Sequence, residues 1–157
     1  MQHKPLQWCF KLKDGVKIVE PNLRLSRSYF EQAKSSLLRA EKDLNDGDLL
    51  WATVAMYYAE YYALYSFLQR IGIKCENHTC SILGASLLLG NEKTITINEH
   101  KIKRIDAQYY IKLDQEIKVR AMLQEAKMFV SNFENIISNL SESDIALYRV
   151  KISQENK

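Results

Sequence analysis

The stretch LLWATVAMYYAEYYALYSFLQRIGIKCENH, residues 49–78, decides the fold because its first twenty residues are apolar or aromatic on every helical face. Helices of this kind either span a membrane or form the centre of a soluble bundle. Glu60 lies in mid-segment, and five phenols need hydrogen-bond partners that hydrocarbon cannot supply. We therefore expect no membrane span, but a buried central helix over residues 49–71 whose tyrosines face a polar cleft or a partner subunit. These tyrosines are Tyr57, Tyr58, Tyr61, Tyr62 and Tyr65.

Helical patterns flank this segment on both sides. Residues 22–44 carry one apolar stripe at spacings of three and four, and the turn Asn-Asp-Gly-Asp at 45–48 separates the two helices. We expect a short helix over 79–89 ended by Gly90, a loop over 91–97 that is extended from Thr94, and helical structure over 98–110. A second long helix starts near Asp114, and Ser141 with Asp144 predicts a capped final helix. The fold class is therefore all-α, an up-and-down antiparallel bundle of four to five main helices.

The length of 157 residues predicts one domain, with residues 1–21 as an irregular leader and 22–157 as the bundle. The leader fits a small hairpin around Asp14 and Gly15. A short helix from Leu6 to Lys13 that stops at Gly15 fits nearly as well.

Charge and cysteine content favour a cytoplasmic protein. The net charge of +3 is too small to diagnose nucleic-acid binding, although it permits a phosphate-bearing ligand. The first residues lack a secretory signal, and three cysteines are an odd number, so we expect reduced thiols. Cys75, His78 and Cys80 crowd together, but a structural zinc site needs four ligands. We therefore expect no metal and no cofactor.

Catalytic and nucleotide-binding signatures of the common enzyme classes are missing. The chain has no P-loop, no G-x-G-x-x-G, no G-x-S-x-G and no H-E-x-x-H motif. Two features remain as candidates for chemistry, namely His78 and the basic-aromatic run KIKRIDAQYY at residues 101–110. Whether the protein is an enzyme stays open, with the balance toward binding.

The order of these segments resembles the HEPN superfamily, in particular its small stand-alone archaeal and bacterial members. The resemblance lies in AMYYAEYYALYSFLQRIGIKCENH at residues 55–78, in RIDAQYY at 104–110, and in the leader WCFKLKDGVKIVEPN at 8–22. It covers nearly the whole chain. It implies a four- to five-helix bundle, a homodimer, and a role in RNA cleavage or nucleotide binding, often beside a nucleotidyltransferase in toxin–antitoxin or defence pairs.

The family's ribonucleases use an Arg-x4-6-His motif that this chain does not complete. After Arg104 there is no histidine, and Tyr109 and Tyr110 stand where one would fall. The leading interpretation is therefore a module that binds a nucleotide, RNA or a nucleotidyltransferase partner. Its candidate binding residues are Arg104, Gln108, Tyr109, Tyr61 and His78.

Two other functions are kept as alternatives: a divergent metal-independent ribonuclease that uses Arg104, Tyr109 and His78 across a dimer cleft, and a non-catalytic dimeric interaction module. Tyr109 and Tyr110 are candidates for adenylate modification by a nucleotidyltransferase, as the resemblance implies. A purely structural interpretation is equally open, in which Arg104 pairs with Asp106, Asp114 or Glu60.

Overall fold

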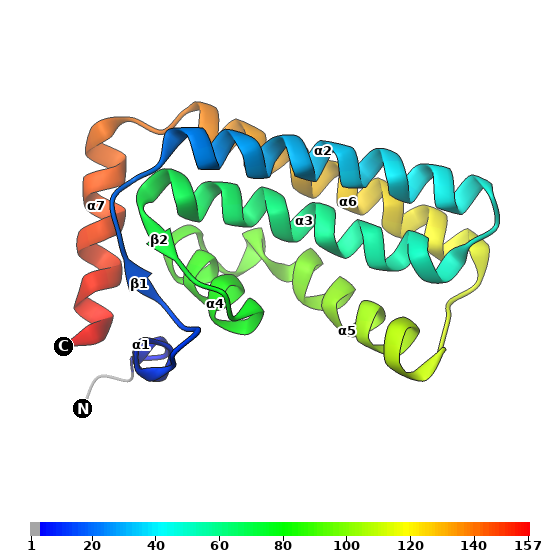
Figure 1. Cartoon of the computed structure of the whole chain (residues 1–157), viewed down its shortest axis with the longest axis horizontal. Helices are drawn as coiled ribbons and strands as arrows, with labels where there is room; N and C mark the ends of the chain where they lie inside the picture. The colour runs from blue at the N-terminus through cyan, green and yellow to red at the C-terminus, as the bar shows by residue number, and fades with distance from the viewer. Residues whose placement is uncertain (1–3) are drawn as a thin grey trace.

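A computed structural model describes residues 4–157 and shows an all-α bundle, which confirms the expected fold class. Three long helices, α2 (Leu23–Asn45), α3 (Leu49–Ile71) and α6 (Glu116–Ser138), lie side by side along the molecule (Figure 1). Helix α5 (Ile95–Tyr110) runs beneath one half of α3, and α4 (His78–Leu89) lies beneath the other. Helix α7 (Glu142–Ser153) stands across one end and is followed by the turn η2 (Gln154–Asn156).

Helix α3 is the centre of the bundle, as its composition predicts. It packs against α2, α4, α5, α6 and α7, and sixteen of its residues are buried. Its ends are those expected from sequence, since Asp48 accepts a bond from the Trp51 amide and Gly72 follows with a φ of 79°. Within residues 4–157, no helix combines the length and the apolarity needed to cross a membrane.

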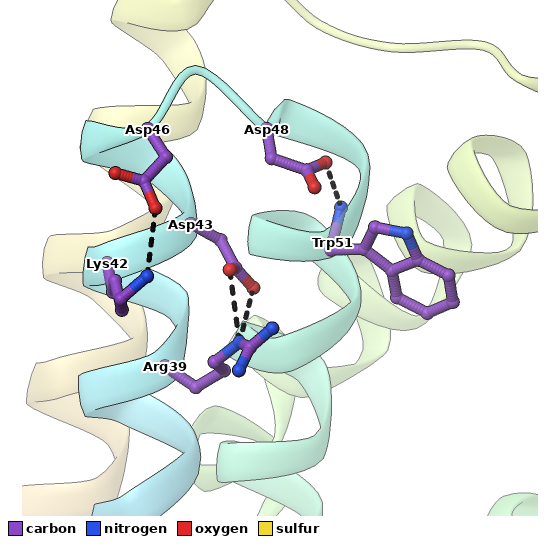
Figure 2. A network of polar contacts seen from close by, with 6 residues as sticks. All are labelled: Arg39, Lys42, Asp43, Asp46, Asp48 and Trp51. Carbon is purple, nitrogen blue, oxygen red and sulfur yellow. Dashed lines mark hydrogen bonds and ion pairs between the residues drawn. The ribbon is translucent and has the colours of Figure 1, made fainter.

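The tight turn between α2 and α3 is held by local polar contacts (Figure 2). The buried carboxylate of Asp43 accepts two bonds from Nε of Arg39, at 3.0 and 3.2 Å. Asp48 caps α3, and the Trp51 side chain points away from α2. Because donors and acceptors lie within four residues of each other, the sequence alone could predict this hairpin of helices.

The leader contains the short helix α1 (Gln7–Lys11), so the helical alternative is closer than the hairpin. Its strand β1 (Lys17–Ile18) pairs antiparallel with β2 (Ile73–Lys74), which follows α3. The guanidinium of Arg149 on α7 ties the two segments together, because Nη1 donates to the carbonyls of Val19, Ile71 and Gly72 at 2.7, 2.9 and 3.2 Å. The leader thus belongs to one packed end of the molecule, beside the C-terminus (Figure 1).

Two expectations from sequence were wrong. Cys9 and Cys80 form a disulfide, with Cα atoms 5.8 Å apart, while Cys75 is free and buried. An odd cysteine count could not show this pairing, because it depends on α1 packing against α4. The expected loop over 91–97 is instead a 3₁₀ turn, η1 (Asn91–Lys93), and the first turn of α5. The β-branched residues of this segment are helical because burial of Ile97, which is complete, outweighs their weak helix propensity.

Candidate functional site

The candidate site forms where the N-terminus of α4 meets α3 and α5. Asn77 caps α4 by accepting a bond from the Cys80 amide at 3.0 Å, and this places His78 at the first residue of the helix. The Nδ1 atom of His78 lies 2.8 Å from the phenol oxygen of Tyr57. The imidazole also stacks on Tyr61, with ring centroids 3.8 Å apart and planes inclined by 14°. His78 is therefore held in one orientation by two tyrosines of α3.

Arg104 reaches the same tyrosines from α5. Its side chain is 9% exposed, and the guanidinium carbon lies 4.8 Å from the ring centroid of Tyr57 and 5.9 Å from that of Tyr58. Its one hydrogen bond within the described chain joins Nη1 to Oε1 of Gln108 at 3.4 Å, and its buried Nε has no partner there. Cation–π contact replaces an ion pair.

The interpretation of Arg104 as a member of an internal ion pair is wrong. Glu60 binds His100 instead, and Asp114 pairs with Lys103 and Lys118. The positive charge of Arg104 thus stays uncompensated by any carboxylate of residues 4–157.

Lys101 adds a second cation; it begins the basic-aromatic run noted in the sequence but was not among the candidate binding residues. It lies one turn before Arg104 on α5, and its Nζ donates to the hydroxyl of Thr79, the residue after His78. Across residues 4–157 it pairs with no carboxylate either. Burial, followed by the positive charges of Arg104 and Lys101, lowers the pKa of His78 to about 4. The site therefore holds two cations and a neutral imidazole at neutral pH.

The phenols around His78 are also neutral. Burial raises the pKa of Tyr57 to about 12 even though Arg104 opposes the shift, and burial raises the pKa of Tyr61 as well. Tyr61 shares a hydrogen bond with Ser81 at 3.1 Å. The aromatic wall consequently contributes ring faces and hydroxyl groups but no negative charge.

A carboxylate–imidazole–carboxylate chain lies one turn before Arg104 on α5, and in it Glu60 and His100 are buried while Glu125 is half-exposed. His100 lies with Nδ1 2.9 Å from Oε1 of Glu60 and Nε2 3.0 Å from Oε2 of Glu125. Burial raises the pKa of Glu60 to about 7, while its bond to His100 acts in the other direction. Burial disfavours the charged form of His100, but Glu60 and Glu125 outweigh it and raise the pKa of His100. The chain links α3, α5 and α6 and so positions the helix that carries Lys101 and Arg104.

The structure brings together four of the residues singled out from sequence and leaves two apart. Tyr61 and His78 are stacked, and Arg104 contacts Gln108. Tyr109 and Tyr110 are 66% and 73% exposed at the C-terminal end of α5. Five residues along an α-helix correspond to a rotation of about 140°, so Tyr109 projects from a different face than Arg104.

The residues missed from sequence are Tyr57 as a contact of both His78 and Arg104, Lys101, and Thr79. One signal was present, because residues three apart share a helical face and Lys101 precedes Arg104 by three. The contacts to α4 carried no such signal, since they join residues about 20 positions apart.

His78 also lines a surface cavity of about 610 Å³. The residues Tyr29, Tyr61, Tyr62, Tyr65 and Gln69 line it, together with Val19, Glu20 and Asn22. The buried Cys75 is also part of the lining. Because Cys80 is bonded to Cys9, the sequence cluster of Cys75, His78 and Cys80 is not available as a ligand set. Among residues 4–157, no group of three or more His, Cys, Asp or Glu side chains is arranged to hold a metal ion.

The protein is thus a small all-α domain, and its aromatic and cationic site lies between the central helix and two shorter helices. The HEPN domain model matches residues 26–143, which span α2 to the start of α7 and include every residue of the candidate site. The chain therefore belongs to the HEPN domain family. Comparison with curated proteins and with solved structures finds no match.

Proposed function

We propose that this HEPN domain binds a phosphate-bearing ligand, a nucleotide or RNA, at Lys101 and Arg104 beside the N-terminus of α4. The observation that carries the proposal is the pair of cations without a carboxylate partner in residues 4–157. Phosphate oxygens accept several charge-assisted hydrogen bonds at once, and a helix N-terminus favours negative charge. Both features converge next to His78.

Aromatic rings supply the second half of a nucleotide site. Tyr58 is half-buried beside Arg104 and meets His78 edge-on, with ring centroids 6.0 Å apart. A base that stacks on this ring would lie beside a phosphate bound by Arg104, whose guanidinium carbon is 5.9 Å from the ring centroid. In this proposal Gln108, Tyr61 and His78 shape the site around Arg104, and the exposed Tyr109 contacts a neighbouring nucleotide of a longer RNA.

The test compares two cations without a carboxylate partner with a paired lysine on the same helix, α5. Lys101→Gln and Arg104→Gln should each weaken nucleotide binding about tenfold or more, the value of one lost charge-assisted bond. Lys103→Gln is the matched control, because Lys103 is paired with Asp114 at 3.1 Å. Binding is measured by calorimetry and by the thermal shift that a nucleotide produces. Equal binding by Lys101→Gln, Arg104→Gln and wild type would refute the proposal.

A divergent ribonuclease is the second candidate, since Arg104 and His78 both contact Tyr57 and are the residue types that bind phosphate and accept a proton in RNA cleavage. The pKa of His78 near 4 makes it a weak base at neutral pH, and this favours binding over catalysis. Incubation with labelled RNA decides between the two. Cleavage that His78→Ala and Arg104→Gln abolish, and that Tyr109→Phe changes, would establish the enzyme.

The same proposal extends to partners. We expect a homodimer, or a complex with a nucleotidyltransferase in a toxin–antitoxin or defence pair, formed through the exposed apolar side chains at and after the end of α5. These are Tyr109, Tyr110, Ile111, Leu113 and Ile117. Light scattering tests the dimer, whose loss of mass on Ile117→Asp would support this surface. An added adenylate mass on Tyr109 or Tyr110 after co-expression with a nucleotidyltransferase would support modification.

A cytoplasmic location is also part of the proposal. The Cys9–Cys80 disulfide weighs against it, because thiol-reducing systems of the cytosol keep most cysteines reduced. Trapping of free thiols in living cells tests the location together with the redox state of this pair.

A further inference from the structure

The tyrosine-lined cavity beside His78 has the shape of an aromatic cage. The rings of Tyr29 and Tyr65 meet at 82° with centroids 4.8 Å apart, so they form two perpendicular walls. The ring of Tyr61 is nearly parallel to that of Tyr65, with planes inclined by 10° and centroids 5.8 Å apart. The ring of Tyr62 is nearly parallel to that of Tyr29, with planes inclined by 22° and centroids 6.0 Å apart. Four rings in two orientations thus line the cavity.

The charges at this cavity differ in sign from those at Arg104. Glu20 and Glu76 line its rim, and both are exposed. The single lysine of the lining, Lys74, lies 3.6 Å from Glu76 and so offsets one of the two carboxylates. Glu20 has no cationic partner within residues 4–157. Burial raises the pKa of Tyr61, Tyr62 and Tyr65, so these rings stay neutral.

From this arrangement we propose that the cavity binds an organic cation with an alkylated ammonium head, held between the ring faces of Tyr29, Tyr62 and Tyr65 and attracted by Glu20. Ring faces carry partial negative charge, and aromatic cages recognise quaternary ammonium groups by this attraction. A volume of about 610 Å³ lies in the range of small-molecule sites and accommodates a head group with an attached chain. An anion would meet two carboxylates and no free cation there.

This site is separate from the proposed phosphate site. Arg104, Lys101 and Tyr58 do not line the cavity, and Tyr29, Tyr62 and Glu20 do not contact Arg104. The two sites share only the stacked pair of His78 and Tyr61. Either proposal can therefore fail without the other.

The test uses choline and its uncharged isostere 3,3-dimethylbutan-1-ol in calorimetric titrations of the purified protein at constant ionic strength. Choline should bind about tenfold more tightly than the alcohol, because only choline gains the cation–π attraction. Tyr62→Leu should weaken choline binding about tenfold, while Tyr62→Phe, which keeps the ring, should change it less than about threefold. Glu20→Gln should weaken it by about threefold.

Nucleotide binding measured on the same variants is the internal control for folding, since none of the substitutions touches Lys101 or Arg104. Should the protein not bind nucleotides at all, the melting temperature of each variant serves as that control. Equal affinity for choline and the alcohol, no binding of choline, or undiminished binding by Tyr62→Leu would each overturn the proposal. Tyr62 and Tyr29 are half-buried rather than core residues, so these variants are expected to fold.

Discussion

The imidazole of His78 lies flat on the phenol ring of Tyr61, with centroids 3.8 Å apart. This contact joins the first residue of α4 to the middle of α3. Both rings line the tyrosine-lined cavity, whose lining includes Glu20 and Glu76 but neither Lys101 nor Arg104. The two cations without a carboxylate partner lie close by, since Lys101 donates to Thr79 and Arg104 contacts Tyr57. A single ring pair is therefore shared by a site suited to anions and a site suited to cations.

The pKa of His78 gives the first prediction. Burial and the charges of Arg104 and Lys101 should give a titration midpoint near 4 in an NMR pH series. Arg104→Gln and Lys101→Gln should raise this midpoint, and Lys103→Gln should leave it in place. Because the folded pKa lies below the unfolded one, the stabilisation from neutral His78 is present above about pH 6.5 and is lost as pH falls toward 4. A midpoint near 6.5 in wild type would contradict the site geometry.

The Glu60–His100–Glu125 chain gives a second prediction, in which stability changes with pH in the direction opposite to that for His78. Both Glu60 and His100 hold a proton more tightly in the folded state. The stabilisation from protonated Glu60 is therefore lost as pH rises toward its folded pKa of about 7, and the stabilisation from His100 is complete below its usual pKa of 6.5 and is lost at higher pH. His78 acts in the other direction below pH 6.5, so the comparison must be with a variant. From pH 5 to 8, wild type should lose on the order of 1 kcal/mol or more of unfolding free energy relative to Glu60→Gln. Urea denaturation measures the difference, and Glu116→Gln on the surface of α6 is the control.

Gly72 and Gly47 give a third, matched prediction. Both have a positive φ, at 79° and 82°, but their surroundings differ. A Cβ on Gly72 would clash with Nη1 of Arg149 and with the carbonyl oxygen of Val19, whereas one on Gly47 would meet nothing within 4 Å. Gly47→Ala should cost about 1 kcal/mol of stability from backbone conformation alone.

Gly72→Ala should cost about 2 kcal/mol or more beyond that value, because it also displaces Arg149 from three carbonyls. Chemical denaturation of the two variants side by side measures the gap. Equal losses of stability would show that the bonds of Arg149 do not hold this end of the bundle together.

The disulfide gives the fourth prediction. Cys9 and Cys80 are separated by 71 positions, and a loop of that size should stabilise the oxidised protein by about 2–4 kcal/mol. The double variant Cys9→Ser/Cys80→Ser should lose this amount relative to oxidised wild type, and much less relative to wild type in reductant. Alkylation of the unfolded, unreduced protein should label one thiol, Cys75. Three labelled thiols would show that the pair is not formed.

Helix boundaries were the part of the fold most open to prediction. The expected ends of α3, the cap at Asp48 and the box formed by Ser141 and Asp144 all match the structure. Each depends on atoms within four residues of one another, so the local sequence specifies them. The prediction of a loop over 91–97 was wrong because burial of Ile97, a tertiary effect, outweighs the preference of its β-branched neighbours for an extended conformation.

The candidate site was predictable only in part. The sequence alone marked Arg104, His78 and Tyr61 as candidates. It did not predict their contacts with Lys101, Tyr57 and Thr79. These contacts join α3, α4 and α5, and no local pattern reports which faces of separate helices meet. The absence of a carboxylate beside Arg104 is likewise visible only when Glu60 and Asp114 are seen to bind other partners.

The amino-acid sequence by itself determined that this chain forms helices, where most of them begin and end, and that residues 49–71 must be buried, because periodicity, caps and uniform hydrophobicity act over a few residues. The tertiary structure alone decided the partner of Cys9, the bonds of Arg149, and the placement of Arg104 and Lys101 near His78. Each of these depends on side chains from distant segments that meet only after the helices pack.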